Sequence, residues 1–219
     1  MLAIMLLNNG VYMNKFKLRQ YISLSLITVI LIFLDQITKL LAKNHLMGHK
    51  PIIIIPNILK LDYLDGGNRG AAFGMLHNKL MFFIFITILA IAVIIAIIKN
   101  SIYVLDYGIN NNYDLIIKAK KTMLLLNYMM SVLLAGAIGN FIDRCTRKSV
   151  IDFISFDFIN FPIFNVADIY VTVSCAFIMI ICIFRLDGQL FNYIFSFKKP
   201  NLDELKEKEK EKYVRRFRS

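Results

Sequence analysis

The sequence predicts an all-α integral membrane protein with four transmembrane helices, and two observations carry this prediction. The 219 residues are 58% hydrophobic with a mean hydropathy of +0.60, whereas soluble chains are about 45–50% apolar. Four apolar runs are also long enough to cross about 30 Å of hydrocarbon. These runs lie at about 21–41, 80–98, 122–143 and 164–184.

Residues 1–20 precede the first run and are expected to lie in the cytoplasm. The opening MLAIMLLNNGVYMNKFK has an apolar stretch too short to span a membrane, and it lacks the small-residue pattern of a signal-peptide cleavage site. Met13 opens a more conventional start just before the first long apolar run. We therefore assign no function to residues 1–12.

The distribution of Lys and Arg predicts the topology. An even number of spans places both termini on one side, and cytoplasmic segments of membrane proteins are enriched in these bases. With the termini inside, the inner segments hold three N-terminal bases, four in residues 99–121 and ten in the tail. The outer segments, 42–79 and 144–163, hold eight. The bias is modest because distal tail charges count little, but it favours an N-in, C-in topology.

The inner segments are expected to be simple. Residues 99–121 contain the run GINNNYD and are predicted to form a polar cytoplasmic connector, and residues 185–219 a charged cytoplasmic tail. The tail alternates acids and bases, which is typical of a solvated helix or a disordered segment. Binding to anionic lipid is the alternative. No internal repeat is visible, so residues 21–184 are predicted to form one four-span domain.

Composition and spacing argue against several function classes. The net charge of +11 does not indicate nucleic-acid binding, because the bases lie in connecting segments and the tail. Cys175 and Cys182 would lie roughly 10 Å apart on a helix, too far for a disulfide. His45 and His49 are spaced i,i+4, but the segment lacks the Glu of a zinc-protease helix and contains Gly48. We expect neither a metal site nor a cofactor.

Charged and amide side chains from different helices collect at one membrane level, at the outer ends of the spans. Acids within a membrane are costly and often functional. The group consists of Asp35 and Lys39 in the first span, Asn140, Asp143 and Arg144 at the end of the third, Asp152 in the following outer segment, and Asn165 and Asp168 at the start of the fourth.

Structural explanations compete with a catalytic one for several of these acids. Each acid lies near a helix end and could simply reach interfacial water. Lys39 is spaced i,i+4 from Asp35 and could neutralise it in a structural ion pair. Asp143 has two arginines close in sequence and could likewise be structural. Asp168 differs, because no base lies within ten residues of it on its own span.

Two carboxylates that share a water molecule can catalyse hydrolysis without a cofactor. Like charges a few Å apart cannot both ionise easily, so one carboxyl keeps its proton. The ionised partner can deprotonate water, and the protonated one can polarise an amide carbonyl. Asp152 and Asp168 flank a short loop that ends in FPIFNVAD and could meet in this way. The spacing alone is a weak signal, because many loops contain two aspartates.

Five motifs resemble those of lipoprotein signal peptidases, also called signal peptidase II. They occur in the order typical of that family and between the expected spans, and they cover the chain from about 21 to 184. The motifs are DQITKLLA (35–42), NRGAAFG (68–74), GNFIDR (139–144), VIDFI (150–154) and FNVAD (164–168).

The resemblance implies a multi-pass aspartic endopeptidase of the bacterial inner membrane, with its active site near the periplasmic face. Such enzymes remove the signal peptide from diacylglyceryl-modified prolipoproteins, cutting just before the lipidated cysteine. The resemblance places the catalytic pair on Asp152 and Asp168. It places residues that bind substrate or brace the site on Asp35, Lys39, Asn68, Gly70, Asn140, Asp143, Arg144 and Asn165.

The resemblance also implies a small β-rich extracytoplasmic cradle after the first span, at about 43–79. Its implied partners are the prolipoprotein substrate, membrane lipids and globomycin-type inhibitors, and we expect a monomer. Gly66 and Gly67 look like extra residues before Asn68, which bears on the cradle geometry. The segment 99–121 and the tail after Arg185 look long for the family.

One different function class stays as the alternative, a small ion- or proton-coupled transporter that uses intramembrane acids. Transporter sites usually lie near the midplane of the membrane, often between inverted repeats. Here the acids collect at one end of the spans and no repeat is visible. A non-catalytic scaffold is disfavoured because both candidate aspartates are present.

Overall fold

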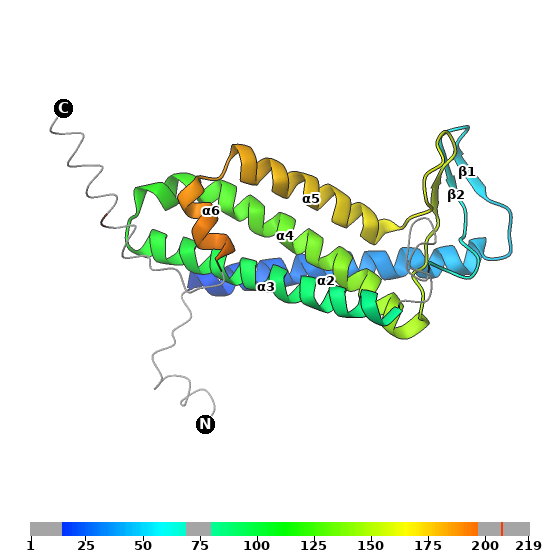
Figure 1. Cartoon of the computed structure of the whole chain (residues 1–219), viewed down its shortest axis with the longest axis horizontal. Helices are drawn as coiled ribbons and strands as arrows, with labels where there is room; N and C mark the ends of the chain where they lie inside the picture. Colours follow the sequence, from blue (N-terminus) through cyan, green and yellow to red (C-terminus); the bar gives the residue numbers. More distant parts are fainter. Residues whose placement is uncertain (1–14, 69–79, 197–206, 208–219) are drawn as a thin grey trace, which may run out of the picture.

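A computed structural model describes residues 15–68, 80–196 and 207. Four of its helices are long and apolar enough to cross a membrane, which confirms the prediction of a multi-pass helical membrane protein (Figure 1). They are α2 (Lys15–Leu46), α3 (Leu80–Asn110), α4 (Asp114–Arg147) and α5 (Val166–Phe184). The remaining elements are β1 (Ile52–Ile55), β2 (Leu59–Leu61), β3 (Ile154–Phe156) and a short helix, α6 (Gly188–Phe195).

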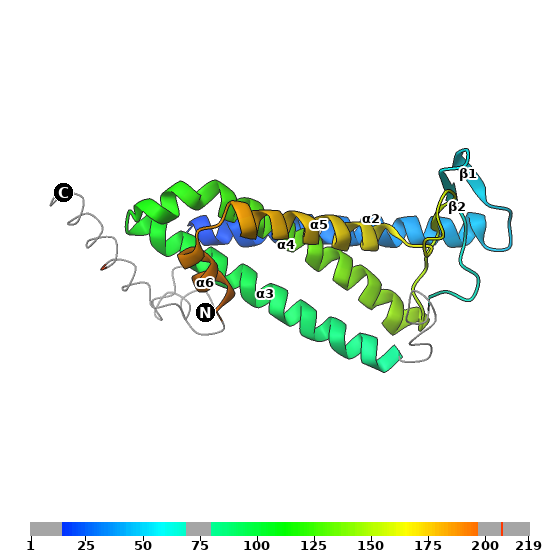
Figure 2. The same cartoon turned by 45° about the horizontal axis from the view of Figure 1, so that its top comes forward.

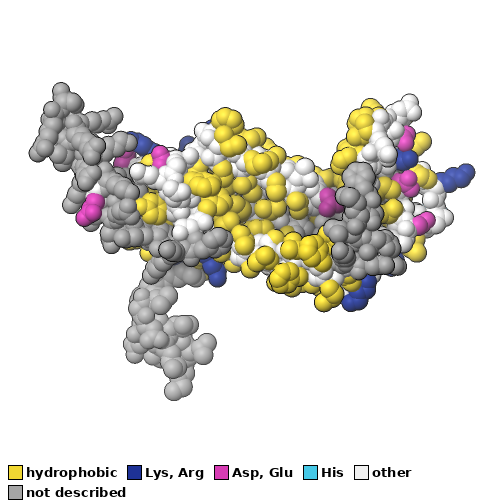
Figure 3. All heavy atoms as spheres, viewed as in Figure 1, with side chains coloured by type: hydrophobic (Ala, Val, Ile, Leu, Met, Phe, Trp, Pro, Cys, Tyr) yellow, Lys and Arg dark blue, Asp and Glu magenta, His cyan; other side chains and the backbone are white. Residues whose placement is uncertain are grey.

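Helix α4 lies at the centre of the bundle. It contacts α2, α3 and α5 more extensively than these three helices contact one another (Figures 1 and 2). Figure 3 shows hydrophobic side chains over the middle of the visible face, with charged side chains gathered toward the two ends. This distribution is expected of a bundle whose middle faces lipid, since charge in the hydrocarbon is costly.

The predicted polar connector at 99–121 is wrong, because α3 continues to Asn110 and α4 begins at Asp114. Ile102, Leu105 and Ile116 are fully buried in one hydrophobic cluster that joins the two helix ends. Burial of these side chains stabilises the helical extension past the polar residues that lie among them. The turn is confined to residues 111–113.

Residues 185–196 also differ from the predicted charged tail at 185–219. The chain turns back after α5, and α6 packs against α3. Leu190 and Ile194 lie on one face of α6, spaced i,i+4, and are fully buried. The side chain of Asn100 donates a 2.7 Å hydrogen bond to a backbone carbonyl just after α6. Apolar packing and this polar contact fix the start of the tail to the bundle.

Three predictions fall outside the described residues. Residues 1–12 precede the first described residue, Lys15. Gly70, a predicted site residue, lies in the gap between Asn68 and α3. Most of the charged tail after Ser196 also lies outside.

The strands form one antiparallel sheet in the order β1-β2-β3 at one end of the bundle. The predicted β-rich segment after the first span is confirmed for β1 and β2, and the third strand comes from the α4–α5 segment. Two isolated bridges extend the pairing, Asn68 with Val150 and Ile154 with Phe164. The sheet therefore ties the segment after α2 to the loop that carries Asp152.

Small residues on α4 allow its neighbours to approach closely. A Cβ atom at Gly136 would lie 2.6 Å from the carbonyl oxygen of Ala167, on α5. A Cβ atom at Gly139 would lie 2.5 Å from Oδ2 of Asp35, on α2. Gly136 and Gly139 therefore allow α5 and α2 to approach α4 closely, because a side chain at either position would collide with them.

Gly139→Ala is expected to lower the thermal unfolding midpoint of the purified protein, because the new methyl group would displace the Asp35 carboxylate. Overpacking of this kind costs about 1–3 kcal/mol. Gly188→Ala is the matched control, since a Cβ atom there meets nothing within 4 Å. Equal midpoints for the two variants would contradict the close approach of α2 and α4.

Candidate active site

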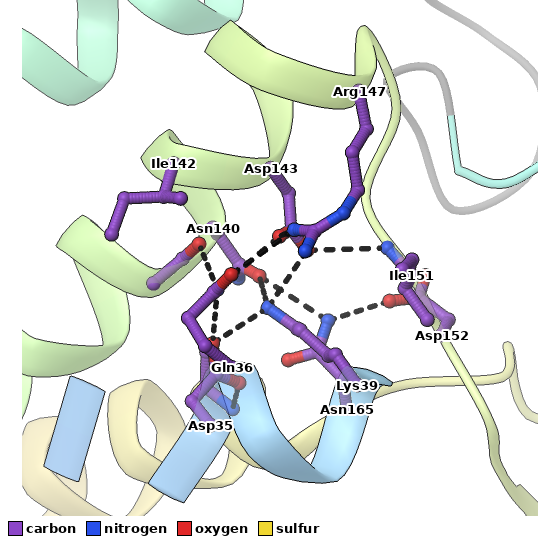
Figure 4. Close-up of polar contacts among 12 residues, drawn as sticks. Asp35, Gln36, Lys39, Asn140, Ile142, Asp143, Arg147, Ile151, Asp152 and Asn165 are labelled. Carbon is purple, nitrogen blue, oxygen red and sulfur yellow. Dashed lines mark hydrogen bonds and ion pairs between the residues drawn. The ribbon is translucent and has the colours of Figure 1, made fainter. Parts of the chain in front are cut away.

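Three buried charged side chains link α2 to α4, and we call Asp35, Lys39 and Asp143 the ion cluster (Figure 4). All three are fully buried. Lys39 Nζ lies 2.9 Å from Asp35 Oδ2, 3.0 Å from Asp143 Oδ2 and 2.9 Å from Asn140 Oδ1. The three acceptors match the three N–H groups of an ammonium. The buried charge is therefore fully hydrogen-bonded, as a buried ion pair must be to persist.

Asp143 is held on both carboxylate oxygens. Its Oδ1 accepts from Arg147, one turn further along α4, and from Gln36 Nε2 at 3.2 Å. Its Oδ2 accepts from Lys39 and from the backbone N–H of Ile151 at 3.3 Å. Two cations and two further donors saturate this carboxylate. This favours a structural role for Asp143, as its sequence neighbours indicated.

Asp35 contacts the first turn of α5 as well as Lys39. Its Oδ1 accepts from the backbone N–H of Ala167 at 3.0 Å, and its Oδ2 accepts from Gln36 at 3.1 Å. The N–H groups in the first turn of a helix have no partner within the helix. Asp35 satisfies one of them and thereby ties α2 to the start of α5.

Asn140 connects the ion cluster to Asp168. Its Oδ1 accepts from Lys39 and from Asn165 Nδ2, at 2.9 and 3.2 Å. Its Nδ2 donates to Asp168 Oδ1 at 2.8 Å. Because a lysine ammonium can only donate, the amide oxygen of Asn140 must face Lys39. The amide nitrogen then faces Asp168.

Asp152 lies in the loop between α4 and α5, with 1% of its surface exposed. Both of its carboxylate oxygens accept from neutral amides, Asn68 Nδ2 at 2.9 Å and Asn165 Nδ2 at 2.6 Å. Burial raises the pKa of Asp152 to about 6, against the lowering effect of the Asn68 hydrogen bond, and the nearby charge of Asp168 adds to the rise. This carboxyl therefore titrates close to neutral pH, as expected of an acid–base catalyst.

Asn165 contacts both candidate catalytic aspartates. It is the N-cap of α5, where its Oδ1 accepts from the backbone N–H of Asp168 at 3.0 Å. The Asp168 side chain accepts in turn from the backbone N–H of Asn165 at 3.2 Å, which completes a capping box. The same Asn165 amide donates to Asp152. The cap therefore fixes Asp168 and joins it to Asp152 through one residue.

Arg144, in the last turn of α4, forms no ion pair with Asp152 or Asp168 within the described part of the chain. Its guanidinium donates to the carbonyl of Asn140 at 3.3 Å and lies 5.5 Å from the ring centroid of Phe83, on α3. Its charge interacts with those of Asp168 and Asp152. It is therefore placed where it can influence the charge state of this pair.

The structure brings the predicted site residues together at the sheet end of the bundle, except Gly70, which is outside the described residues. The sequence did not indicate Gln36, which contacts both acids of the ion cluster. It also did not indicate that Arg147 contacts Gln36. The residues of this contact are 111 positions apart, so no local pattern could have indicated it. Within the described part of the chain, no three His, Cys, Asp or Glu side chains converge as a metal-binding group.

Comparisons with known proteins show the family to which the chain is similar. The family described as signal peptidase (SPase) II matches residues 27–184. The lipoprotein signal peptidase of Streptococcus agalactiae serotype Ia is 39% identical over 159 residues, covering 73% of this chain and 90% of that protein. The lipoprotein signal peptidase of Clostridium tetani is 37% identical over 174 residues, covering 78% and 98%.

Two solved structures of bacterial membrane enzymes have a similar fold. The one determined at 1.9 Å has a TM-score of 0.55 and 30% identity, and the match covers 75% of this chain and 94% of that one. The one determined at 2.3 Å has a TM-score of 0.52 and 32% identity, covering 73% and 86%. The family match over residues 27–184 and the relatives matched over at least 90% of their length together lead to one conclusion: the chain belongs to the signal peptidase II family.

Proposed function

We propose that this protein is an intramembrane aspartic endopeptidase that removes signal peptides from diacylglyceryl-modified prolipoproteins, cutting before the lipidated cysteine. Family membership supports the substrate class. The observation that carries the chemistry is the Asn165 amide, which contacts Asp152 while its backbone binds Asp168. We propose that the two carboxylates, both held by Asn165, share a water molecule.

In this proposal, Asp152 and Asp168 share one proton between them. The ionised carboxylate takes a proton from water, and the water oxygen attacks the carbonyl carbon of the scissile amide. The protonated carboxyl donates to the carbonyl oxygen, which forms a tetrahedral intermediate. Collapse breaks the C–N bond and delivers a proton to the amine. The products are a signal-peptide carboxylate and a lipidated cysteine with a free amino group.

The surrounding amides determine how the pair is held. Asn68 and Asn165 donate to Asp152, and Asn140 donates to Asp168. Neutral donors fix a carboxylate without the strong lowering of pKa that a salt bridge causes. Asp35 and Asp143 hold Lys39, and Lys39 donates to Asn140. We expect Arg144 and Asn68 to lie along the substrate path.

The proposal places the chain in the bacterial inner membrane in an N-in, C-in topology, with the sheet and the aspartates near the periplasmic face. The excess of bases at the opposite end supports this orientation. Residues 1–20 and the tail would be cytoplasmic, flanking one four-span peptidase domain at 21–184. The substrate is held in the bilayer by its lipid and its apolar signal peptide, so its scissile bond lies near the outer interface.

A reconstituted cleavage assay tests the function. The purified protein in lipid nanodiscs should shorten a diacylglyceryl-modified prolipoprotein, and the same substrate without the lipid should be a poor one. A globomycin-type inhibitor should occupy the same site and block cleavage, and a chelator should not change the rate. Retention of the uncleaved substrate at high enzyme concentration would refute the proposal. A transporter role is not supported, because the acids of the candidate site lie at one end of the bundle.

Asn68→Ala is expected to shift the pH profile of kcat/KM. The Asn68 amide stabilises the charged form of Asp152, so its loss should raise the pKa of Asp152 above its value of about 6. Asp152 would then stay protonated to higher pH, and the limb of the profile that reports it should move up by about one unit. Asn111→Ala, in the distant α3–α4 turn, is the control. A limb that stays in place or moves down would contradict this assignment.

A further inference from the structure

We propose that Gln36 and Arg147 are positioning residues for the peptidase reaction. Together they fix the ion cluster that orients Asn140 toward Asp168. The inference rests on the proposed function, since Asp168 is one of the two proposed catalytic carboxylates. Neither residue belongs to the site residues that the motifs predicted.

The amide of Gln36 lies among acceptors from two helices (Figure 4). Its Nε2 lies 3.1 Å from Asp35 Oδ2, 3.2 Å from Asp143 Oδ1 and 3.2 Å from the carbonyl oxygen of Gly139. A flipped amide would turn its oxygen toward these acceptors and would lose every one of these hydrogen bonds. The orientation of the Gln36 amide is therefore fixed by chemistry, with the nitrogen toward the carboxylates.

Arg147 fixes the other side of the same amide. Its Nη1 donates to Gln36 Oε1 at 3.0 Å and also contacts Asp143 Oδ1. The Arg147 side chain is 32% exposed, whereas Asp143 is fully buried. Arg147 thus reaches from the rim of the bundle onto the ion cluster and holds Gln36 against it.

Arg147 also completes the charge balance. The buried cluster contains two carboxylates, Asp35 and Asp143, and one ammonium, Lys39. With Arg147 the group contains two negative and two positive charges, and without it one negative charge is uncompensated. An unpaired charge in a buried group is strongly unfavourable.

The disturbance reaches Asp168 through Lys39 and Asn140. Lys39 divides its three N–H groups among Asp35, Asp143 and Asn140. When Asp143 loses Arg147 or Gln36, the ammonium is drawn toward that carboxylate and its bond to Asn140 weakens. The oxygen of the Asn140 amide is then held mainly by Asn165, and the donor now 2.8 Å from Asp168 Oδ1 is less firmly oriented.

The test compares Gln36→Ala, Arg147→Ala and the double variant in the cleavage assay with a diacylglyceryl-modified prolipoprotein. Each single variant should lower kcat about 10-fold with KM changed less than about two-fold, because positioning acts on the reaction step. The double variant should lose about as much as the worse single variant, since both act through one cluster. Arg147→Lys should recover most of kcat. Lys43→Ala, which removes an exposed base one turn beyond Lys39, should match the parental protein.

The pH dependence separates positioning from a merely structural role. In the two single variants, the limb of the pH profile of kcat that reports the aspartate pair should shift from its parental position. The shift is expected because the hydrogen bonding of this pair changes. The inference is overturned if both single variants retain kcat within two-fold of the parental value. It is also overturned by a merely structural effect. In that case the losses of kcat would match a lowered folded fraction, would add in the double variant, and would leave the pH profile of kcat unchanged. A parental protein that does not cleave at all would overturn the proposed function, and this inference with it.

Discussion

Asp152→Asn and Asp168→Asn should each lower kcat for prolipoprotein cleavage by about 10³-fold while the protein still inserts and folds. General acid–base catalysis contributes about 10²–10⁴-fold. An amide of the same shape can neither accept the proton of water nor deliver one to the carbonyl oxygen. The double variant should lose little more than the worse single variant, because the two groups act as one unit.

The control for this pair is Asp157→Asn. Asp157 lies in the same α4–α5 segment as Asp152 and makes a partly exposed ion pair with Lys60 at 3.1 Å, a kind of contact worth little. This variant should cleave at the parental rate, which shows that loss of an acid at this level is not harmful in itself. Near-parental turnover by either Asp152→Asn or Asp168→Asn would reassign the catalytic pair, with Asp143 the next candidate.

Lys39→Met should produce the largest loss of stability. The substitution keeps the apolar stem but leaves Asp35 and Asp143 with one cation, Arg147, between them. Removing one partner of a buried ion pair costs about 3–5 kcal/mol, a large part of a typical folding free energy. The folded yield after detergent extraction and the thermal unfolding midpoint should both fall.

A second substitution distinguishes the charge from the packing at this site. Lys39→Met with Asp143→Asn leaves one acid, Asp35, and one base, Arg147, in the group. The double variant should recover part of the unfolding midpoint, but kcat should stay low because Asn140 has lost one of the two donors that orient it. Lys43→Met, one turn further along α2, is the matched control. Equal midpoints for the Lys39 and Lys43 variants would contradict the role of the ion cluster.

Local spacing could predict the parts of the site that lie within one helix. Asp35 and Lys39 are four residues apart on α2 and form the expected ion pair. Asn165 and Asp168 are three residues apart, the spacing of a capping box, and they form one at the start of α5. Both contacts depend on helix geometry alone, which a sequence specifies directly.

Contacts between distant segments could not be predicted from spacing. Gln36 and Arg147 meet because α2 and α4 approach closely at Gly139. The continuation of α3 to Asn110 depends on packing with α4 and α6, which buries side chains such as Leu105 in a stretch that mixes apolar and polar residues. Tertiary burial outweighs local polarity in such a segment.

The sequence also left Asp143 as a close competitor of Asp152, and the environments of the two carboxylates now favour Asp152. Asp143 contacts two cations, Lys39 and Arg147. Asp152 accepts from neutral amides, and its pKa is raised to about 6. A carboxyl that titrates near neutral pH is suited to proton transfer, whereas one neutralised by fixed cations is not.

A single-turnover reaction in ¹⁸O-labelled water tests the central claim most directly. The account predicts that the released signal peptide carries one ¹⁸O atom in its new carboxylate, and that the mature product begins at the lipidated cysteine. This result shows that water attacks the scissile carbonyl directly, which is the role proposed for the water between Asp152 and Asp168. An unlabelled peptide from the first turnover would mean that an enzyme carboxylate supplied the oxygen, and this result would contradict the account. Cleavage at any other bond would also contradict it.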